Sequence, residues 1–303
     1  MLTELDTLYK LGWRDRVFIV DDNFIGNHKR ALELARSLEE WQRQHERPFF
    51  FYAEASIDLA QRAERIEATV RANFLYVFVG IESPSKDSLS EAKKFQNLRR
   101  DPLECIPTIQ NGGLWVTAGF TVGFDSDPET IFQNQIEFIE QAVLPWAMAG
   151  FLQAPPTTPL YERMRKEGRF LENPTATSNL SSPNFRTLLP LPHLFGGFQD
   201  ILATLYSPSG YFHRCLNSLS HWQTREEQTV TAQYPFWRRV STALRSIFRQ
   251  GILSFYRGGY WRPVPDSQSM PVLPRKTAHE CDYVVLRAPL HQFCQARDGR
   301  TGS

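Results

Sequence analysis

Five carboxylates lie at the ends of predicted strands, where the chain leaves a strand and enters the next helix. Asp21 and Asp22 follow the apolar run VFIV, Glu54 lies near the end of FFFYAEA, Glu82 lies in GIES and Asp125 in GFDSD. In parallel βα folds, ligands bind at the carboxyl ends of the strands. Clustered carboxylates hold a cation or accept hydrogen bonds from hydroxyl and ammonium groups. The pattern therefore predicts a ligand-binding edge.

Helix capping is the competing interpretation of these acids. Asp and Ser often cap the helix that follows them, and for any single acid this explanation is as good as ligand binding. Ser83 and Asp127, each followed by a proline, are predicted to be such caps. For the set as a whole, four of five strands ending in an acid favour ligand binding.

The elements that must position these acids alternate between strand and helix. The predicted strands are short apolar runs of the kind that is buried on both faces of a parallel sheet, and they cover residues 17–20, 49–55, 75–81, 114–124 and 147–153. Helices are predicted over 28–45, with Asn27 as N-cap, and over 61–72. The fold class is therefore α/β. It is either a doubly wound sheet or a partial TIM-like (βα) barrel, since about five βα units are too few to close an eight-stranded barrel.

Two glycines, Gly119 and Gly123, lie inside the fourth predicted strand, AGFTVGF. Glycine inside a strand marks a bulge or a close backbone approach. The approaching group is either a flat ligand such as an adenine ring or a neighbouring helix.

Composition narrows the classes of partner and location. The formal net charge is +1, so charge predicts no nucleic-acid partner. The four cysteines (Cys105, Cys215, Cys281 and Cys294) form no CxxC pair, and a long, cysteine-poor chain is not expected to hold a disulfide framework. No apolar run reaches the roughly 18 residues of a spanning helix, and no signal peptide is recognised. A cytoplasmic location is expected.

The alternation of predicted strands and helices ends at Phe170, and the composition changes after it. We predict a βα barrel over 1–171, a linker rich in Pro, Ser, Thr and Asn over 172–194, a helical C-terminal domain over 195–262 and an irregular tail over 263–303.

The segment 234–258 is predicted to form a basic amphipathic helix, because apolar residues recur at helical spacing among arginines and no acid is present. The favoured interpretation is a helix packed on the barrel with its basic face in solvent. The alternative is peripheral contact with an anionic membrane surface, which would suit a lipid-like substrate.

Six motifs occur in one order along the chain: VFIVDDNFIGN, FYAEASIDLA, VFVGIESPSKDSL, QNLRRD, GFTVGFDSDPETIF and LQAPPTTPLYERM. Together with TLYSPSGYFHRC and FRQGILSFYRGGYW, they resemble, over residues 1–262, the cobalamin (B12)-binding radical S-adenosylmethionine (SAM) proteins with a helical C-terminal domain of unknown function. The resemblance implies a partial barrel with SAM, a [4Fe-4S] cluster and cobalamin as cofactors. It further implies a 5′-deoxyadenosyl radical, methyl transfer or another modification of an unactivated carbon, and an electron donor such as flavodoxin or ferredoxin.

The resemblance also assigns roles to the strand-end residues. Asp21 and Asp22 match the position that meets the SAM amino group, and Glu54 matches a position facing the active site. Glu82, followed by Ser83, matches the position that holds the ribose hydroxyls.

The remaining cofactor-binding candidates follow from later motifs. They are Arg99 or Arg100 for the SAM carboxylate, the backbone of Gly119 and Gly123 beside adenine, and Asp125 at the same edge. The family often has GxIxGxxE at the adenine position, whereas Thr121 here replaces the Ile and Ser126 the Glu, so mainly backbone contacts to adenine are expected.

The larger departure is that CxxxCxxC, whose thiolates bind the cluster, occurs nowhere in the sequence. The chain is therefore expected to be a C-terminal fragment that lacks the cobalamin domain and the cluster loop, and to be inactive alone. Two other functions stay open. One is a divalent-metal-dependent hydrolase or lyase that places Asp21, Asp22, Glu54 and Glu82 around Mg²⁺. The other is an inactive fragment or binding module. The substrate is an unidentified small or lipid-like molecule.

Overall fold

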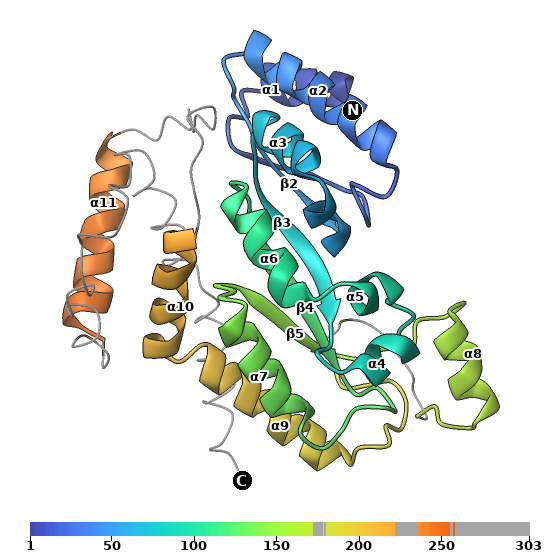
Figure 1. Ribbon diagram of the computed structural model, residues 1–303. Coiled ribbons are helices and arrows are strands. Elements are labelled where there is room, and N and C mark those ends of the chain that lie inside the picture. Colours follow the sequence, from blue (N-terminus) through green and yellow to red (C-terminus); the bar gives the residue numbers. More distant parts are fainter. Residues whose placement is uncertain (172–177, 179, 222–235, 255–256, 258–303) are drawn as a thin grey trace. The chain divides into compact units, whose positions relative to one another are not determined.

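The computed structural model describes residues 1–171, 178, 180–221, 236–254 and 257 (Figure 1). Contacts divide the chain into two units, residues 1–231 and 232–303, which are treated separately below. Residues 172–177 and 179 of the predicted linker, and the whole predicted tail 263–303, lie outside the described residues.

Five parallel strands form one sheet in the first unit, in the order β1-β2-β3-β4-β5. They are β1 (Arg16–Ile19), β2 (Phe50–Ala55), β3 (Phe74–Glu82), β4 (Trp115–Val122) and β5 (Ala147–Phe151). The sheet curls into a half-barrel with helices packed against it (Figure 1). The predicted partial βα barrel is confirmed, and each apolar run that was assigned to a strand overlaps one, with bounds that differ by a few residues at most.

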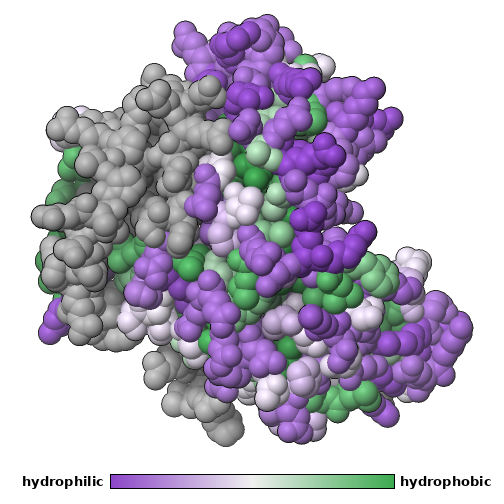
Figure 2. All heavy atoms as spheres, in the orientation of Figure 1, coloured by the Kyte–Doolittle hydropathy of each residue, from purple (hydrophilic) through white to green (hydrophobic). Residues whose placement is uncertain are grey.

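Helices precede β1, lie between successive strands and follow β5. They are α1 (Leu2–Lys10), α2 (His28–Gln44), η1 (Ile57–Gln61), α3 (Ala63–Arg71), α4 (Lys86–Glu91), α5 (Phe95–Arg99), α6 (Pro102–Asn111), α7 (Ile131–Gln141), α8 (Pro159–Lys166), α9 (Leu191–Leu205) and α10 (Pro208–His221). Hydrophilic residues dominate the surface over α1, α2 and α8 (Figure 2). Among the described residues, no helix is both long and apolar enough to cross a membrane.

One of the three predicted helix caps is confirmed. The Asn27 side chain accepts a hydrogen bond from the Arg30 N–H, as an N-cap does. The prediction for Ser83 was wrong by two residues, because α4 begins after Ser85. The prediction for Asp127 was wrong as well, because α7 begins at Ile131 after Thr130. In both cases the proline lies in the turn before the helix.

The two faces of the sheet differ, since side chains alternate along each strand. Val77, Val79 and Ile81 of β3 are buried on the helix-covered face and belong to the main hydrophobic core. The residues between them lie on the concave face. Across that face the rings of Phe18, Tyr52 and Tyr76 stack in sequence, with centroids 4.7 Å apart at each step.

We call these three rings the aromatic row. Phe18, at one end of the row, is 38% exposed. Tyr76, at the other end, is more buried, and this burial raises the pKa of its hydroxyl to about 12. The row crosses β1, β2 and β3 in register, two residues before Glu54 on β2 and near the amino end of β3. It lines this part of the concave face with aromatic rings.

Helix α9 belongs to the same core as the sheet. Leu194, Phe198 and Ile201 are buried in it, and the ring of Phe198 lies 4.5 Å from that of Phe151 on β5. The helix crosses α7 so closely that a Cβ added to Gly197 would lie 2.3 Å from the Phe132 ring. The first helix of the predicted C-terminal region therefore packs on the half-barrel.

The second unit contains α11 (Phe236–Ser246), which continues into the π-helical turn η2 (Ile247–Ile252). The helix predicted over 234–258 is thus present over 236–252. Its arginines at 245, 249 and 257 are exposed.

Candidate functional site

The end of β3 has an irregular backbone that aims Glu82 into the concave face. The pairing of β3 with β4 shifts register between Gly80 and Glu82, as in a β-bulge. Glu82 has a φ of +67°, which is rare for a residue with a side chain. The buried Asn97 of α5 holds this bulge, since its Nδ2 donates to the carbonyl oxygens of Gly80 and Ile81, both at 3.0 Å. Such strain clusters at functional sites.

The Glu82 carboxylate is held from two sides. Lys94 Nζ lies 2.9 Å from Oε1, and the Thr121 hydroxyl donates to Oε2 at 3.0 Å. The Glu82 side chain is only 22% exposed. A Cβ added to Gly80 would lie 2.8 Å from the Glu82 carboxylate and 3.1 Å from Lys94 Nζ. Glycine at 80 therefore leaves the room that this ion pair occupies.

Glu54 feels the charges of both Asp22 and Lys94. The pKa of Glu54 is raised, first by burial and then by the negative charge of Asp22, while the Lys94 charge lowers it. The loop after β1 is tied to β2, because Phe24 N–H donates to the Glu54 carbonyl at 2.9 Å and Ser56 N–H donates to the Asn23 side chain at 3.0 Å. We call Asp22, Glu54, Glu82, Lys94 and Thr121 the strand-end cluster.

Asp21 does not share this arrangement. It is exposed, and its Oδ1 accepts a hydrogen bond of 2.8 Å from the Asn23 N–H, which is a local turn contact. Ser83 is buried, and its hydroxyl accepts from the Ser85 N–H at 3.2 Å. Both residues shape loops at the edge where the strand-end cluster lies.

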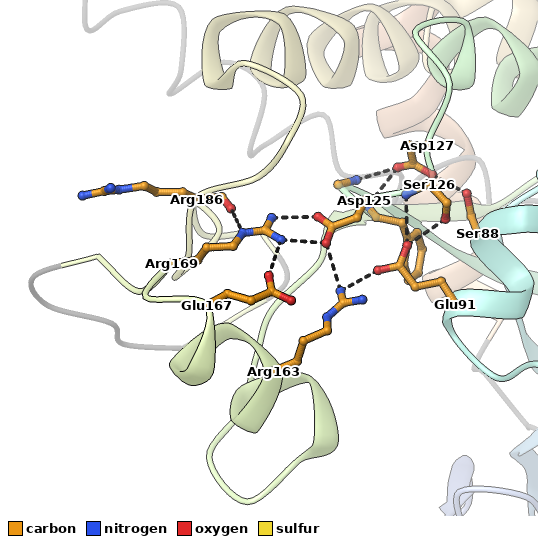
Figure 3. Close-up of polar contacts among 11 residues, drawn as sticks. Ser88, Glu91, Asp125, Ser126, Asp127, Arg163, Glu167, Arg169 and Arg186 are labelled. Atoms are coloured by element: carbon orange, nitrogen blue, oxygen red, sulfur yellow. Dashed lines mark hydrogen bonds and ion pairs between the residues drawn. The ribbon is translucent and has the colours of Figure 1, made fainter.

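Asp125 is held in an ion-pair network (Figure 3). Arg169 contacts both of its carboxylate oxygens at 2.7 Å, and Arg163 lies 3.2 Å from one of them. Arg163 also contacts Glu91 of α4 at 2.6 Å. The network therefore joins the loop after β4 to α4 and to α8. None of these ion pairs includes a member of the strand-end cluster.

Asp127 is buried and holds the loop after β4 by hydrogen bonds; it is not the predicted helix cap. Its carboxylate accepts hydrogen bonds from the Ser88 hydroxyl at 2.6 Å, the Gly123 N–H at 2.8 Å and the Phe124 N–H at 3.0 Å (Figure 3). Burial raises the pKa of Asp127 to about 6, against the effect of the three donors. These hydrogen bonds fix the backbone where β4 ends.

The two glycines of β4 have different surroundings. A Cβ at Gly119 would lie 2.7 Å from the ring of Phe78, so this ring lies against the Gly119 backbone. Gly123 has a φ of +105°, and its N–H is bonded to Asp127. Gly123 thus shapes the loop, and Gly119 admits an aromatic ring from the neighbouring strand.

Arg99 and Arg100 lie apart from the strand-end cluster. They line a cavity of about 550 Å³ together with Asp58, Gln61, Asp101, Glu104 and Cys105. The cation that contacts Glu82 is Lys94, which sequence reasoning missed. Its signal was the pair Lys93-Lys94 shortly after GIES, in a stretch without helical periodicity.

Among the described residues, the thiols and acids do not fit an iron–sulfur cluster or a metal ion. The two cysteines among the described residues, Cys105 and Cys215, are buried in different helices, and burial raises the pKa of Cys215 to about 11. Within the described part of the chain, no three His, Cys, Asp or Glu side chains are grouped to hold a metal. The Mg²⁺ arrangement considered for Asp21, Asp22, Glu54 and Glu82 is therefore not formed.

Comparison with known proteins identifies a matching domain and two similar proteins. Residues 158–300 match a domain of unknown function, DUF4070. The chain is 34% identical over 98% of its length to the uncharacterized methyltransferase sll1242 of Synechocystis sp., covering 55% of it. It is 34% identical over 86% of its length to the hopanoid C-2 methylase of Rhodopseudomonas palustris, covering 50% of it. The chain thus spans about half the length of these curated relatives.

The fold has a counterpart of known structure. The radical SAM methyltransferase TsrM from Kitasatospora setae, solved with cobalamin and a [4Fe-4S] cluster, superimposes with a TM-score of 0.53 over 80% of this chain and 54% of that chain, at 13% identity. The half-barrel, the matched domain and the relatives agree with the ordered motifs of the sequence. The chain is therefore similar to curated methyltransferases over about half of their length, and its half-barrel has the fold of a radical SAM methyltransferase solved with cobalamin.

Proposed function

We propose that the half-barrel binds SAM at its strand-end cluster and serves a cobalamin-dependent radical SAM methyltransferase. The observation that carries the proposal is the grouping of Glu82, Lys94 and Thr121, with Glu54 and Asp22 beside them, at the carboxyl ends of β1 to β4. This edge is where parallel βα folds bind ligands. The methyltransferase names of the relatives support the reaction class.

The charges of the cluster fit the polar groups of SAM. Glu82 and Thr121 offer an acceptor and a hydroxyl to the ribose, because a carboxylate accepts two hydroxyl hydrogen bonds. Glu54 and Asp22 offer negative charge to the amino group. Lys94 offers a cation to the carboxylate, the role first considered for Arg99 or Arg100. When bound, SAM supplies the methyl group and the radical chemistry of the family.

In that reaction, the residues of this chain would position SAM and shield its polar contacts from water. The Asn97 clamp and the register shift fix the direction of Glu82, and preformed geometry of this kind lowers the entropy lost on binding. The low exposure of Glu82 strengthens its hydrogen bonds, since the local dielectric is below that of water. Among the described residues, Cys105 and Cys215 lie in different helices and form no set of thiolates that could hold an iron–sulfur cluster.

The substrate proposed is a small molecule with an apolar body. The aromatic row provides a stacking floor on the concave face, and one relative bears the name of a methylase of hopanoids. We place the protein in the cytoplasm, with a flavodoxin or ferredoxin as electron donor to the whole enzyme. Replacing Tyr52 with Leu should weaken binding of a polycyclic apolar probe and leave SAM binding unchanged.

The test is SAM affinity, measured by equilibrium dialysis with labelled SAM on the full chain. Lys94→Met and Glu82→Gln should each weaken binding by roughly tenfold or more, the loss expected for one charged hydrogen bond. Lys86→Met and Glu129→Gln, at exposed positions outside the cluster, are the matched controls and should bind as the wild type does. Thermal stabilisation by Mg²⁺ but not by SAM would overturn the proposal in favour of a metal-dependent hydrolase or lyase.

A further inference from the structure

The helix of the second unit exposes large apolar side chains. Trp237 is 76% exposed, Leu244 60%, Phe248 56%, Ile252 52% and Leu253 64%. Large exposed apolar groups in a cluster mark an interaction surface. Four of these residues lie within two consecutive helical segments, α11 and η2, and Leu253 follows directly as the C-cap of η2. The five therefore form one local surface.

The exposed groups share one side of the helix. At 3.6 residues per turn, Trp237, Leu244 and Phe248 project on the same side. Arg245 and Arg249, each one residue further on, are exposed beside them, whereas Ser246 is buried. The exposed side is therefore apolar along one edge and cationic along the other.

The positive charge of this segment favours an anionic lipid surface over a protein as the partner. Between Thr229 and Pro265 the sequence has six arginines and no acid, although the whole chain carries a formal charge of only +1. A surface that joins aromatic and aliphatic groups to a row of arginines, with no acid to repel phosphate, is the pattern of helices that lie in the interface of anionic lipid bilayers. A protein partner would need acids matched to each arginine.

We propose that α11 and η2 form a membrane-docking surface that lies flat on an anionic phospholipid bilayer. Trp237, Leu244 and Phe248 enter the acyl boundary, and Arg245 and Arg249 reach the phosphate groups. Arginine suits this place, because its long apolar stem packs on the lipid while the guanidinium stays at the headgroups. The proposal rests on the second unit alone and goes beyond the proposed SAM site, so either can fail while the other stands.

The test is sedimentation of the full chain with sucrose-loaded vesicles. One set contains phosphatidylcholine alone and the other equal parts of phosphatidylcholine and phosphatidylglycerol. The chain should bind the second set and not the first, and raising the salt concentration should release it, since salt screens exposed charges. The double variant Arg245→Glu and Arg249→Glu should lower partitioning by at least about tenfold, and Phe248→Ser should lower it at unchanged charge.

The control variant carries the same charge change elsewhere. Arg165→Glu with Lys166→Glu alters two exposed cations of α8 in the first unit and should sediment as the wild type does. Unaltered thermal melting and SAM binding of every variant show that the fold is intact. Absence of binding to either vesicle would overturn the proposal, as would equal losses in the control. A chain that ignores vesicles but forms a dimer that Phe248→Ser dissociates would overturn it in favour of a protein occupant.

Discussion

Lys94 Nζ lies 2.9 Å from Oε1 of Glu82, and both groups lie over the backbone of Gly80, where a Cβ would come within 3.1 Å of either. The pair joins a cation from the start of α5 to the irregular end of β3. Its geometry depends on a residue that has no side chain, which makes the pair open to a direct test.

Gly80→Ala should weaken SAM binding while leaving stability nearly unchanged. The added methyl meets the far ends of two flexible side chains, which can move apart, so the fold tolerates it but the ion pair is displaced. We expect a loss of affinity of roughly tenfold, about 1.4 kcal/mol, measured by equilibrium dialysis. Gly196→Ala, which meets open space, is the control, and an unchanged affinity in both variants would contradict the role of this pair.

Asp125→Asn should separate stability from ligand binding. The variant removes a charge that Arg169 and Arg163 contact, leaving partly buried guanidinium groups without a full partner. Unfolding free energy in urea should fall by about 1–3 kcal/mol, while SAM affinity should stay within about twofold of wild type. A loss of affinity as large as that of Glu82→Gln would instead place Asp125 in the cofactor site.

Asp127 should make stability depend on pH in the direction opposite to that of a salt-bridged acid. Its pKa of about 6 in the folded chain lies above the ordinary value of 3.8, so between these values the native state binds more protons than the unfolded state. Its contribution to stability therefore grows as the pH falls from about 7 to about 4 and is lost as the pH rises. Over this pH range the contribution of Asp127 to the free energy of unfolding should change by about 3 kcal/mol.

The measurement is urea unfolding of the wild type and Asp127→Asn at several pH values. The difference between the two curves isolates Asp127, because the other titrating groups are common to both proteins. Asp87→Asn, an exposed acid of α4, controls for net charge. Parallel curves for wild type and Asp127→Asn would show that burial does not raise this pKa.

Two adjacent glycines of α9 should respond to alanine with opposite signs. Gly196 meets nothing within 4 Å, so Gly196→Ala should stabilise the helix by about 0.5–1 kcal/mol. At Gly197 the new Cβ would lie 2.3 Å from the Phe132 ring, so Gly197→Ala should destabilise by about 1–3 kcal/mol. Urea unfolding measures both, and a loss in both variants would contradict the close crossing of α7 and α9.

The strands were predictable because each is an apolar run bounded by polar residues. Such a run carries its signal locally, and the strand-end acids Asp22, Glu54 and Glu82 could be placed from it. Lys94 could not be placed, because nothing local indicates that the turn between α4 and α5 returns it to Glu82. The φ of +67° at Glu82 could not be predicted from the sequence either, since bulges are set by the pairing between strands.

The role of Asp125 could not be predicted, because its ion-pair partners are distant in sequence. Arg169 is 44 residues away and lies beyond α8, in a part of the chain with no periodic pattern. Asp127 was misassigned for a related reason. Its sequence context, Asp-Pro-Glu, is that of a helix start, but tertiary contacts with Ser88 and the Gly123 backbone outweighed the local preference.

The packing of α9 has a consequence for how this family varies. The matched domain of unknown function begins at residue 158, yet Phe198 and Ile201 within it are embedded among side chains of β5 and α7. A boundary drawn at the start of that domain cuts through one hydrophobic core. Exchange of the C-terminal region between relatives would therefore succeed only when the recipient barrel brings a matching outer surface, so the two regions are expected to diverge together rather than as interchangeable modules.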